Sequence, residues 1–214
     1  MRRTLSSTEV GAALKLFGVT NAEAGSRGPA VAGTELVTVR EIAAIVVPSA
    51  YAAVEPSTEH ALSAGGVIAE YAKRAAVLPA PVGVVFRSQQ AVTRWLELHY
   101  VALTDALSFV DDRVVGRVHV WRPGEASERE VGIDLAAAAA DVLRELRRSA
   151  VATVPLRTEH LTGIVLSAAF LVEQALWKEF AAKVAEQASG LTDVRLELTG
   201  PWPPYDFVHM EFGG

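Results

Sequence analysis

The stretch Asp193-Val194-Arg195-Leu196-Glu197-Leu198-Thr199 alternates strictly between polar and apolar side chains. Successive side chains of a β-strand point to opposite faces of the sheet, so this pattern predicts a strand with one buried face and one polar face. The alternation is the most regular in the chain. We therefore expect these residues to form the last strand of a sheet whose other elements precede it.

The residues before this strand alternate between strand-like and helix-like periodicity. In chain order, we expect a strand at 113–121, a helix at 134–149, a strand at 161–171 and a helix at 173–188, with room for one more strand at 150–156. Each helix has apolar residues three and four positions apart, which is typical of one buried face. The combined order is that of a ferredoxin-like βαββαβ fold, in which helices cover one face of an antiparallel sheet.

The first half of the chain shows a looser version of the same layout. A turn at Asp111-Asp112 separates the halves, so the predicted fold is α+β with two ferredoxin-like domains, residues 1–110 and 111–200. A proline-rich tail, residues 201–214, is expected to pack back on the body. The elements expected in the first half are strands at 12–19, 36–40, 42–47 and 83–86, a helix from 57 to about 75, and one long helix that begins at Ser88 and buries Ala91, Trp95, Leu98, Ala102 and Ala106.

Composition favours a folded protein that does not bind nucleic acid. The chain has 214 residues, of which 50% are hydrophobic and 21% are charged, and this allows a sizeable core in one or two domains. Its formal net charge is -5 and it contains no long basic run, so a phosphate-binding surface is not expected. Without cysteine the chain can form neither disulfides nor thiolate metal sites.

The sequence also predicts a soluble, cytoplasmic protein with no membrane partner. Its most apolar stretch, residues 164–172, has about half the length that a membrane-spanning helix requires. The N-terminal Met-Arg-Arg is not followed by the apolar segment of a signal peptide.

Residues that could carry chemistry do not form a recognisable catalytic or metal-binding pattern. The five histidines lack zinc-ligand spacing. The carboxylates of Asp111 and Asp112 adjoin at a turn, where they are expected to point apart. Arg144, Arg147 and Arg148 suit the C-terminal end of their helix, or else an acidic partner. Because no GxSxG elbow, Walker loop or GxGxxG motif is present, we expect no enzyme activity, cofactor or metal.

The segment after the last strand is the most unusual in the chain. Pro201, Pro203 and Pro204 fall within four residues and predict a stiff, extended course outside helix and sheet ladder. Such a segment would hold Trp202 and Tyr205 with little conformational entropy left to lose. Two interpretations follow: the aromatic residues pin the tail to the protein's own body, or they dock a partner.

Three segments resemble the gas vesicle protein F/L family. LTGPWPPYDFV at 198–208 is similar to its C-terminal signature, LSAAFLV at 166–172 to its LNAAFLV segment, and VLPAPVGVVF at 77–86 to its VLPLRFGTVF segment. The three occur in the family's order. The signature positions carried over are Leu78, Pro79, Gly83, Phe86, Ala168, Ala169, Phe170, Leu171, Gly200, Pro201, Trp202, Pro203, Pro204, Tyr205 and Phe207.

The chain also departs from the family pattern. Pro81 replaces an arginine, Ser167 an asparagine and Val115 a glutamate, while His119 stands where lysine is common. The stretch between residues 121 and 161 is shorter than usual. The chain is therefore identified as a divergent and somewhat short member.

The resemblance implies a two-domain α+β protein without catalytic residues. It implies a role in gas vesicle assembly, with the hydrophobic shell protein and other accessory proteins as partners and a place in the cytoplasm with gas vesicles. Self-association is left open. The alternative is a ferredoxin-like small-molecule-sensing or regulatory module that acts outside gas vesicles.

Overall fold

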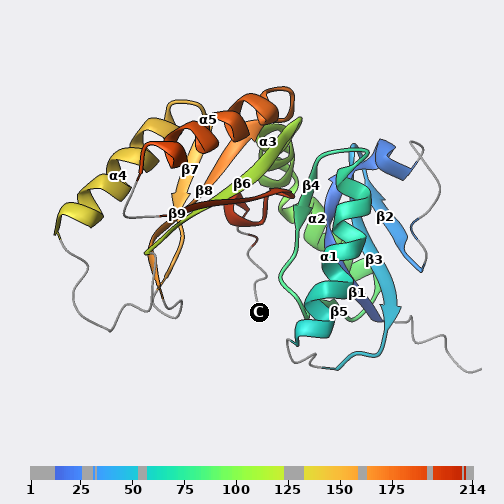
Figure 1. The fold of residues 1–214 in the computed structure, drawn as a ribbon. Helices are drawn as coiled ribbons and strands as arrows, with labels where there is room; N and C mark the ends of the chain where they lie inside the picture. The colour runs from blue at the N-terminus through green and yellow to red at the C-terminus, as the bar shows by residue number, and fades with distance from the viewer. Residues whose placement is uncertain are drawn as a thin grey trace, which may run out of the picture. The chain divides into compact units, whose positions relative to one another are not determined.

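The computed structural model describes residues 13–25, 31, 33–52, 57–122, 133–158, 163–191, 195–208 and 210, with side chains of the fourth helix described from residue 137. The chain divides into two compact units, Met1–Ser108 and Phe109–Gly214. Each unit holds one antiparallel sheet with helices packed on it (Figure 1).

The second unit has the βαββαβ order that the sequence predicts. Its strands lie in the order β7-β8-β6-β9, and every neighbouring pair is antiparallel, which is the arrangement of a ferredoxin-like sheet. Its elements are β6 (Arg113–Trp121), α4 (Ile133–Arg147), β7 (Ala152–Pro155), β8 (Ile164–Glu173), η2 (Gln174–Leu176), α5 (Trp177–Ser189), β9 (Arg195–Trp202) and η3 (Tyr205–Phe207).

One face of this sheet is covered by α4 and α5 (Figure 1). Phe170 of β8 and Phe180 of α5 lie at its centre, with their ring centroids 5.4 Å apart and both side chains buried. The opposite face carries Ala169 and Leu171, the alternate residues of β8. The remaining buried residues of the helix-covered core are Val118, Val142, Leu146, Ala168, Val172 and Val184.

The last strand extends beyond the predicted boundary at Thr199. β9 runs to Trp202 and includes Pro201, so the prediction that the prolines lie outside the sheet is wrong for this residue. A shift of register between Val115 and Arg117 lets Trp202 pair with Val115. Proline is tolerated here because β9 is an edge strand, where a missing N–H need not break a ladder. Residues 192–194 lie outside the described residues.

The first unit places three strands before its first helix. The central strand β1 pairs with β3, β4 and β5, while β2 and β4 lie at the ends of the order β2-β3-β1-β4. α1 packs on one side of this sheet against Phe17 and Ile45. The elements are β1 (Ala13–Asn21), η1 (Ala22–Gly25), β2 (Glu35–Val39), β3 (Ile42–Ser49), α1 (Thr58–Ala72), β4 (Val77–Pro79), β5 (Val85–Phe86), α2 (Gln89–Leu98) and α3 (Tyr100–Val110). The sequence did not predict β4.

The long helix predicted from Ser88 is two helices. The Ser88 hydroxyl caps α2 by accepting a hydrogen bond from the Ala91 N–H at 3.2 Å, as expected, but the helix ends before His99, whose φ of -101° and ψ of 11° are not helical. The buried residues keep helical spacing across the break, with Val92 and Leu96 in α2 and Leu103 and Leu107 in α3. Leu98 and Ala102, both predicted to be buried, are instead exposed, Leu98 by 79%.

Candidate protein-binding surface on the second unit

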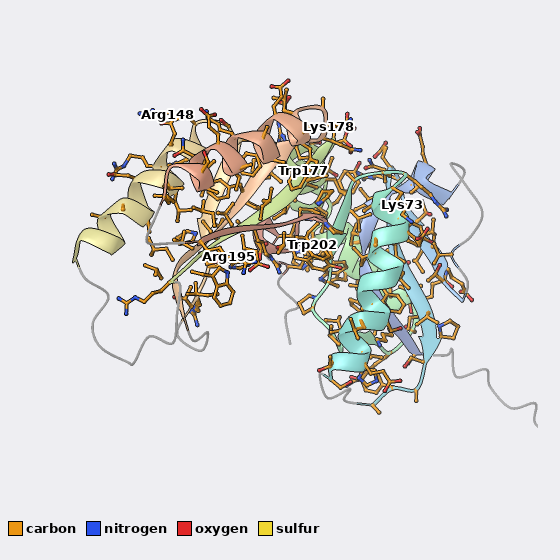
Figure 2. The ribbon with its side chains drawn as sticks, in the orientation of Figure 1. Lys73, Arg148, Trp177, Lys178, Arg195 and Trp202 are labelled. Atoms are coloured by element: carbon orange, nitrogen blue, oxygen red, sulfur yellow. The ribbon has the colours of Figure 1, made fainter. Side chains whose placement is uncertain are left out.

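Gly200 sits where β9 leaves regular pairing. Its φ is +125°, and a Cβ atom there would lie 2.6 Å from the Val115 carbonyl oxygen, 3.2 Å from the Trp177 ring and 3.3 Å from the Trp202 ring. Only glycine fits both this conformation and this close approach without a shift of the backbone. Gly200 therefore lets β9 approach β6 closely, with the Trp177 ring of α5 and the Trp202 ring of β9 each lying against it (both are labelled in Figure 2).

Two aromatic side chains of this region are partly open to solvent. Trp202 is 45% exposed and Tyr205 is 38% exposed, although the Trp202 indole N–H donates to the Thr199 hydroxyl at 3.1 Å. Leu176, next to the half-buried Trp177, is 42% exposed. We call Leu176, Trp177, Trp202 and Tyr205 the aromatic edge. Aromatic side chains held in place on a surface are typical of protein interfaces.

The turn after β9 is fixed to the sheet face opposite the one that α4 and α5 cover. The Arg117 guanidinium donates from Nε to Asp206 Oδ2 at 2.9 Å and from Nη2 to Oδ1 at 3.0 Å. Phe207 packs against Val115, Ala169 and Leu171, all fully buried. The segment thus contacts the protein's own body through Asp206 and Phe207 and leaves Trp202 and Tyr205 partly free.

The same face carries a pair of polar side chains from adjacent strands. Ser167 Oγ lies 2.7 Å from His119 Nδ1, and Ser167 is only 4% exposed. Burial lowers the pKa of the His119 imidazole, with a smaller opposing effect from Glu197 and a further lowering by Arg117. His119 and Ser167 are two of the positions where the chain departs from the family pattern, and here they contact each other. Burial also raises the pKa of the Tyr205 phenol.

The structure brings together two of the three signature segments. Residues 168–171 and 200–207 both lie in the second unit and meet where Phe207 packs on Ala169 and Leu171. Ala168 and Phe170 point to the helix-covered face instead. Pro203 and Pro204 connect β9 to η3, and Pro204 is buried.

The third segment, residues 77–86, belongs to the first unit. Leu78 and Pro79 form part of β4, and Leu78 is fully buried. Gly83 has a φ of +97° in the following turn. The Phe86 ring lies 5.6 Å from the Trp95 ring. These contacts give the segment a packing role.

Sequence reasoning missed the ion pair and the contribution of Trp177. Arg117 lies on the polar face of a central strand and Asp206 is the one acidic residue in 201–208, so opposite charges were available. Nothing in the spacing indicated that residues 89 positions apart would meet. Trp177 follows the helical spacing of Phe180 and Val184, which are buried, but is itself only half-buried.

Within the described ranges, no three His, Asp or Glu side chains are grouped so as to hold a metal ion. His160 and His209 lie outside those ranges. No helix in the described part of the chain is long and apolar enough to span a bilayer.

Comparisons with known proteins all match this chain to gas vesicle proteins. The sequence model of "Gas vesicle synthesis protein GvpL/GvpF" matches residues 14–134 and 121–209. Gas vesicle protein F2 of Halobacterium salinarum is 28% identical over 147 residues, 68% of this chain and 65% of that protein. Gas vesicle protein L of Streptomyces sp. is 31% identical over 166 residues, 61% of this chain and 62% of that protein. The chain thus spans a little under two thirds of the length of these curated relatives.

Two crystal structures share the fold. Gas vesicle protein GvpF from Anabaena sp. PCC7120 matches with a TM-score of 0.74 and 14% identity, over 95% of this chain and 99% of that chain. GvpF from Microcystis aeruginosa matches with a TM-score of 0.71 and 12% identity, over 94% and 100%. The sequence model covers nearly the whole chain, and the fold agrees with it. The chain therefore belongs to the gas vesicle synthesis protein GvpL/GvpF family.

Proposed function

We propose that this protein is a non-enzymatic accessory protein of gas vesicle assembly that binds the hydrophobic shell protein through its aromatic edge. Other gas vesicle accessory proteins are its further partners, and it acts in the cytoplasm where gas vesicles form. Family membership supports the gas vesicle role. The observation that carries the binding role concerns Trp202. Its ring lies against Gly200 and its indole N–H donates to the Thr199 hydroxyl, yet the side chain remains 45% exposed.

The physical reason lies in the surface that a shell subunit exposes before it assembles. An apolar surface of a few hundred Å² or more is prone to aggregation unless a partner covers it. Trp and Tyr contribute much of the binding energy of interfaces because they bury a large area at low entropic cost. Since Asp206 and Phe207 hold the backbone beside Trp202 and Tyr205 in place, these rings need little ordering when they bind.

The test is the solubility of the shell protein produced with and without this chain. The soluble fraction should rise clearly when the two are co-expressed, and the two should co-purify. A shell protein that is equally insoluble in both cases would argue against the proposal. A thermal-shift screen of small metabolites distinguishes the sensing alternative, which predicts a large stabilisation by one of them.

A further inference from the structure

The first unit carries a second surface, at the free edge of its sheet. Four strands end the two sheet orders: β2, β4, β7 and β9. Three of them contain a proline, namely Pro79, Pro155 and Pro201, which blocks the pairing of a further strand. β2, with the sequence Glu-Leu-Val-Thr-Val, contains neither proline nor lysine, and its register with β3 is unbroken. Of these four strands, β2 alone contains no proline, and its one charged residue is Glu35 at its start.

The register fixes which backbone groups of β2 face outward. Val39 pairs with Ile42 across a two-residue turn, so these two residues form a hydrogen-bonded pair. Hydrogen-bonded and non-hydrogen-bonded pairs alternate along an antiparallel ladder. Thr38 with Ala43 and Leu36 with Ile45 are therefore non-hydrogen-bonded pairs, and the N–H and C=O groups of Leu36 and Thr38 point away from β3. No described residue pairs with them on that side. They are free to pair with another strand.

A groove of about 610 Å³ runs beside this edge, between β2 and the junction of α2 and α3. Leu98 and Val101 line it and are 79% and 70% exposed. The other lining residues are Thr38, Val39, Arg40, Thr93, Glu97 and Tyr100. An open strand edge therefore adjoins an apolar wall.

The charged side chains of the groove indicate which charge a bound segment should carry. The Arg40 guanidinium lies over the Tyr100 ring, 4.8 Å from its centroid, and the Tyr100 hydroxyl donates to the Glu41 carboxylate. These three side chains are thus engaged with one another. The charge of Arg40 acts on the neighbouring Glu41 carboxylate, so these two charges offset each other. Glu97 forms no ion pair or hydrogen bond with any described side chain, so the remaining charge at the groove is negative.

We propose that an extended segment of a partner protein binds here as an additional strand on β2, with an apolar side chain on Leu98 and Val101 and a lysine or arginine at Glu97. Main-chain hydrogen bonds to Leu36 and Thr38 supply the pairing, and the groove selects the side chains. This site lies in the other unit from the aromatic edge and does not depend on it. With both, the chain can hold two different partners.

The test uses the full chain and a phage-displayed library of random seven-residue peptides. Enriched peptides should alternate apolar residues and carry a basic residue, and the synthetic peptide should slow hydrogen exchange of the Leu36 and Thr38 amides. Leu98→Glu should weaken peptide binding by about tenfold or more, since a charge replaces the apolar wall. Leu62→Glu is the matched control: Leu62 is 73% exposed on α1, outside the groove, and its variant should bind as the unmodified chain does.

Two further variants separate the contributions of backbone and charge. Thr38→Pro removes the outward N–H without removing a bond to β3, so it should abolish binding and leave the melting temperature close to that of the unmodified chain. Glu97→Lys should shift the enriched peptides from basic to acidic. If Thr38→Pro does not fold, Leu98→Glu and Glu97→Lys still decide the matter.

Three results would overturn the proposal. One is a library from which no sequence is enriched. Another is an enriched peptide whose affinity is the same for Leu98→Glu and Glu97→Lys as for the unmodified chain. The third is protection of the Leu36 and Thr38 amides that grows with protein concentration alone, which would assign the edge to a second copy of the chain. None of these results bears on the role of Trp202.

Discussion

Arg117 and Asp206 form a two-point ion pair, with Nε–Oδ2 and Nη2–Oδ1 distances of 2.9 and 3.0 Å, that joins the central strand β6 to the turn after β9. Asp206 is only 13% exposed and Arg117 is 35% exposed. The pair holds in place the segment that carries Trp202 and Tyr205. It therefore connects the stability of the fold to the geometry of the aromatic edge.

Breaking this pair should loosen the turn after β9. We expect Asp206→Asn to lower the free energy of unfolding by about 1 kcal/mol, since solvent at Arg117 screens part of the attraction. Urea denaturation measures the loss. The matched control is Asp141→Asn, which removes a pair between two side chains that are each 67% exposed and should change stability hardly at all. Equal losses in both variants would mean that the Arg117 pair has no special role.

Trp202 distinguishes a packing role from a docking role. Because it is 45% exposed, Trp202→Ala should cost about 1–2 kcal/mol of stability, less than the about 3–5 kcal/mol expected for a buried aromatic residue. Phe170→Ala, at a fully buried position, supplies the comparison and should reach the larger range. Thermal or urea denaturation of the two variants checks the difference. A loss at Trp202 as large as that at Phe170 would show that the indole is chiefly a core residue.

Two glycines should respond to alanine in opposite directions. Gly200→Ala places a Cβ 2.6 Å from the Val115 carbonyl oxygen at a φ of +125°, so we expect a loss of about 1–3 kcal/mol. At Gly66, in the interior of α1, a Cβ would meet nothing within 4 Å, so Gly66→Ala should gain about 0.5–1 kcal/mol. Melting temperatures of both variants test the pair. A stabilised Gly200→Ala would show that the close approach to β6 is not required.

His119 should make stability fall as the solution becomes acidic. Burial lowers its pKa in the folded state below the unfolded value, so the folded protein binds a proton less readily than the unfolded chain. The contribution is therefore fully present above the unfolded pKa of about 6.5 and is lost as pH falls through the folded pKa.

The measurement is the urea midpoint at pH 7.5 and at pH 5. His119→Gln keeps a polar side chain beside Ser167 but removes the titration, so its midpoint should depend less on pH over this interval. An identical pH dependence in the variant and the unmodified chain would assign the effect to other groups.

The local sequence pattern predicted the second unit well because the periodicity of each segment indicates whether it is a strand or a helix. β6 and β8 were expected within three residues of their observed ends, since β6 alternates and β8 is apolar except at Ser167 and its terminal Glu173. In the first unit, the starts of α1 and α2 were expected at Ser57 and Ser88, and in the structure each serine hydroxyl accepts a hydrogen bond from the N–H three residues later. Periodicity and capping residues depend only on neighbours in the sequence, so they can be recognised without the structure.

What depended on distant contacts was not predicted. The break at His99 was missed because apolar residues continue at helical spacing on both sides of it. Pro201 was excluded from the sheet because its place on an edge strand follows only from the order of all four strands. The ion pair of Arg117 with Asp206 and the groove beside β2 likewise arise from tertiary packing.

The central claim, that the aromatic edge binds the shell protein, is tested most directly by co-purification with paired variants. Trp202→Ala combined with Tyr205→Ala should reduce the recovered shell protein about tenfold or more, as expected when aromatic anchors are lost. Tyr51→Ala removes a 59% exposed aromatic from the first unit and should leave recovery unchanged. Equal recovery with the double variant, the control and the unmodified chain would contradict the account.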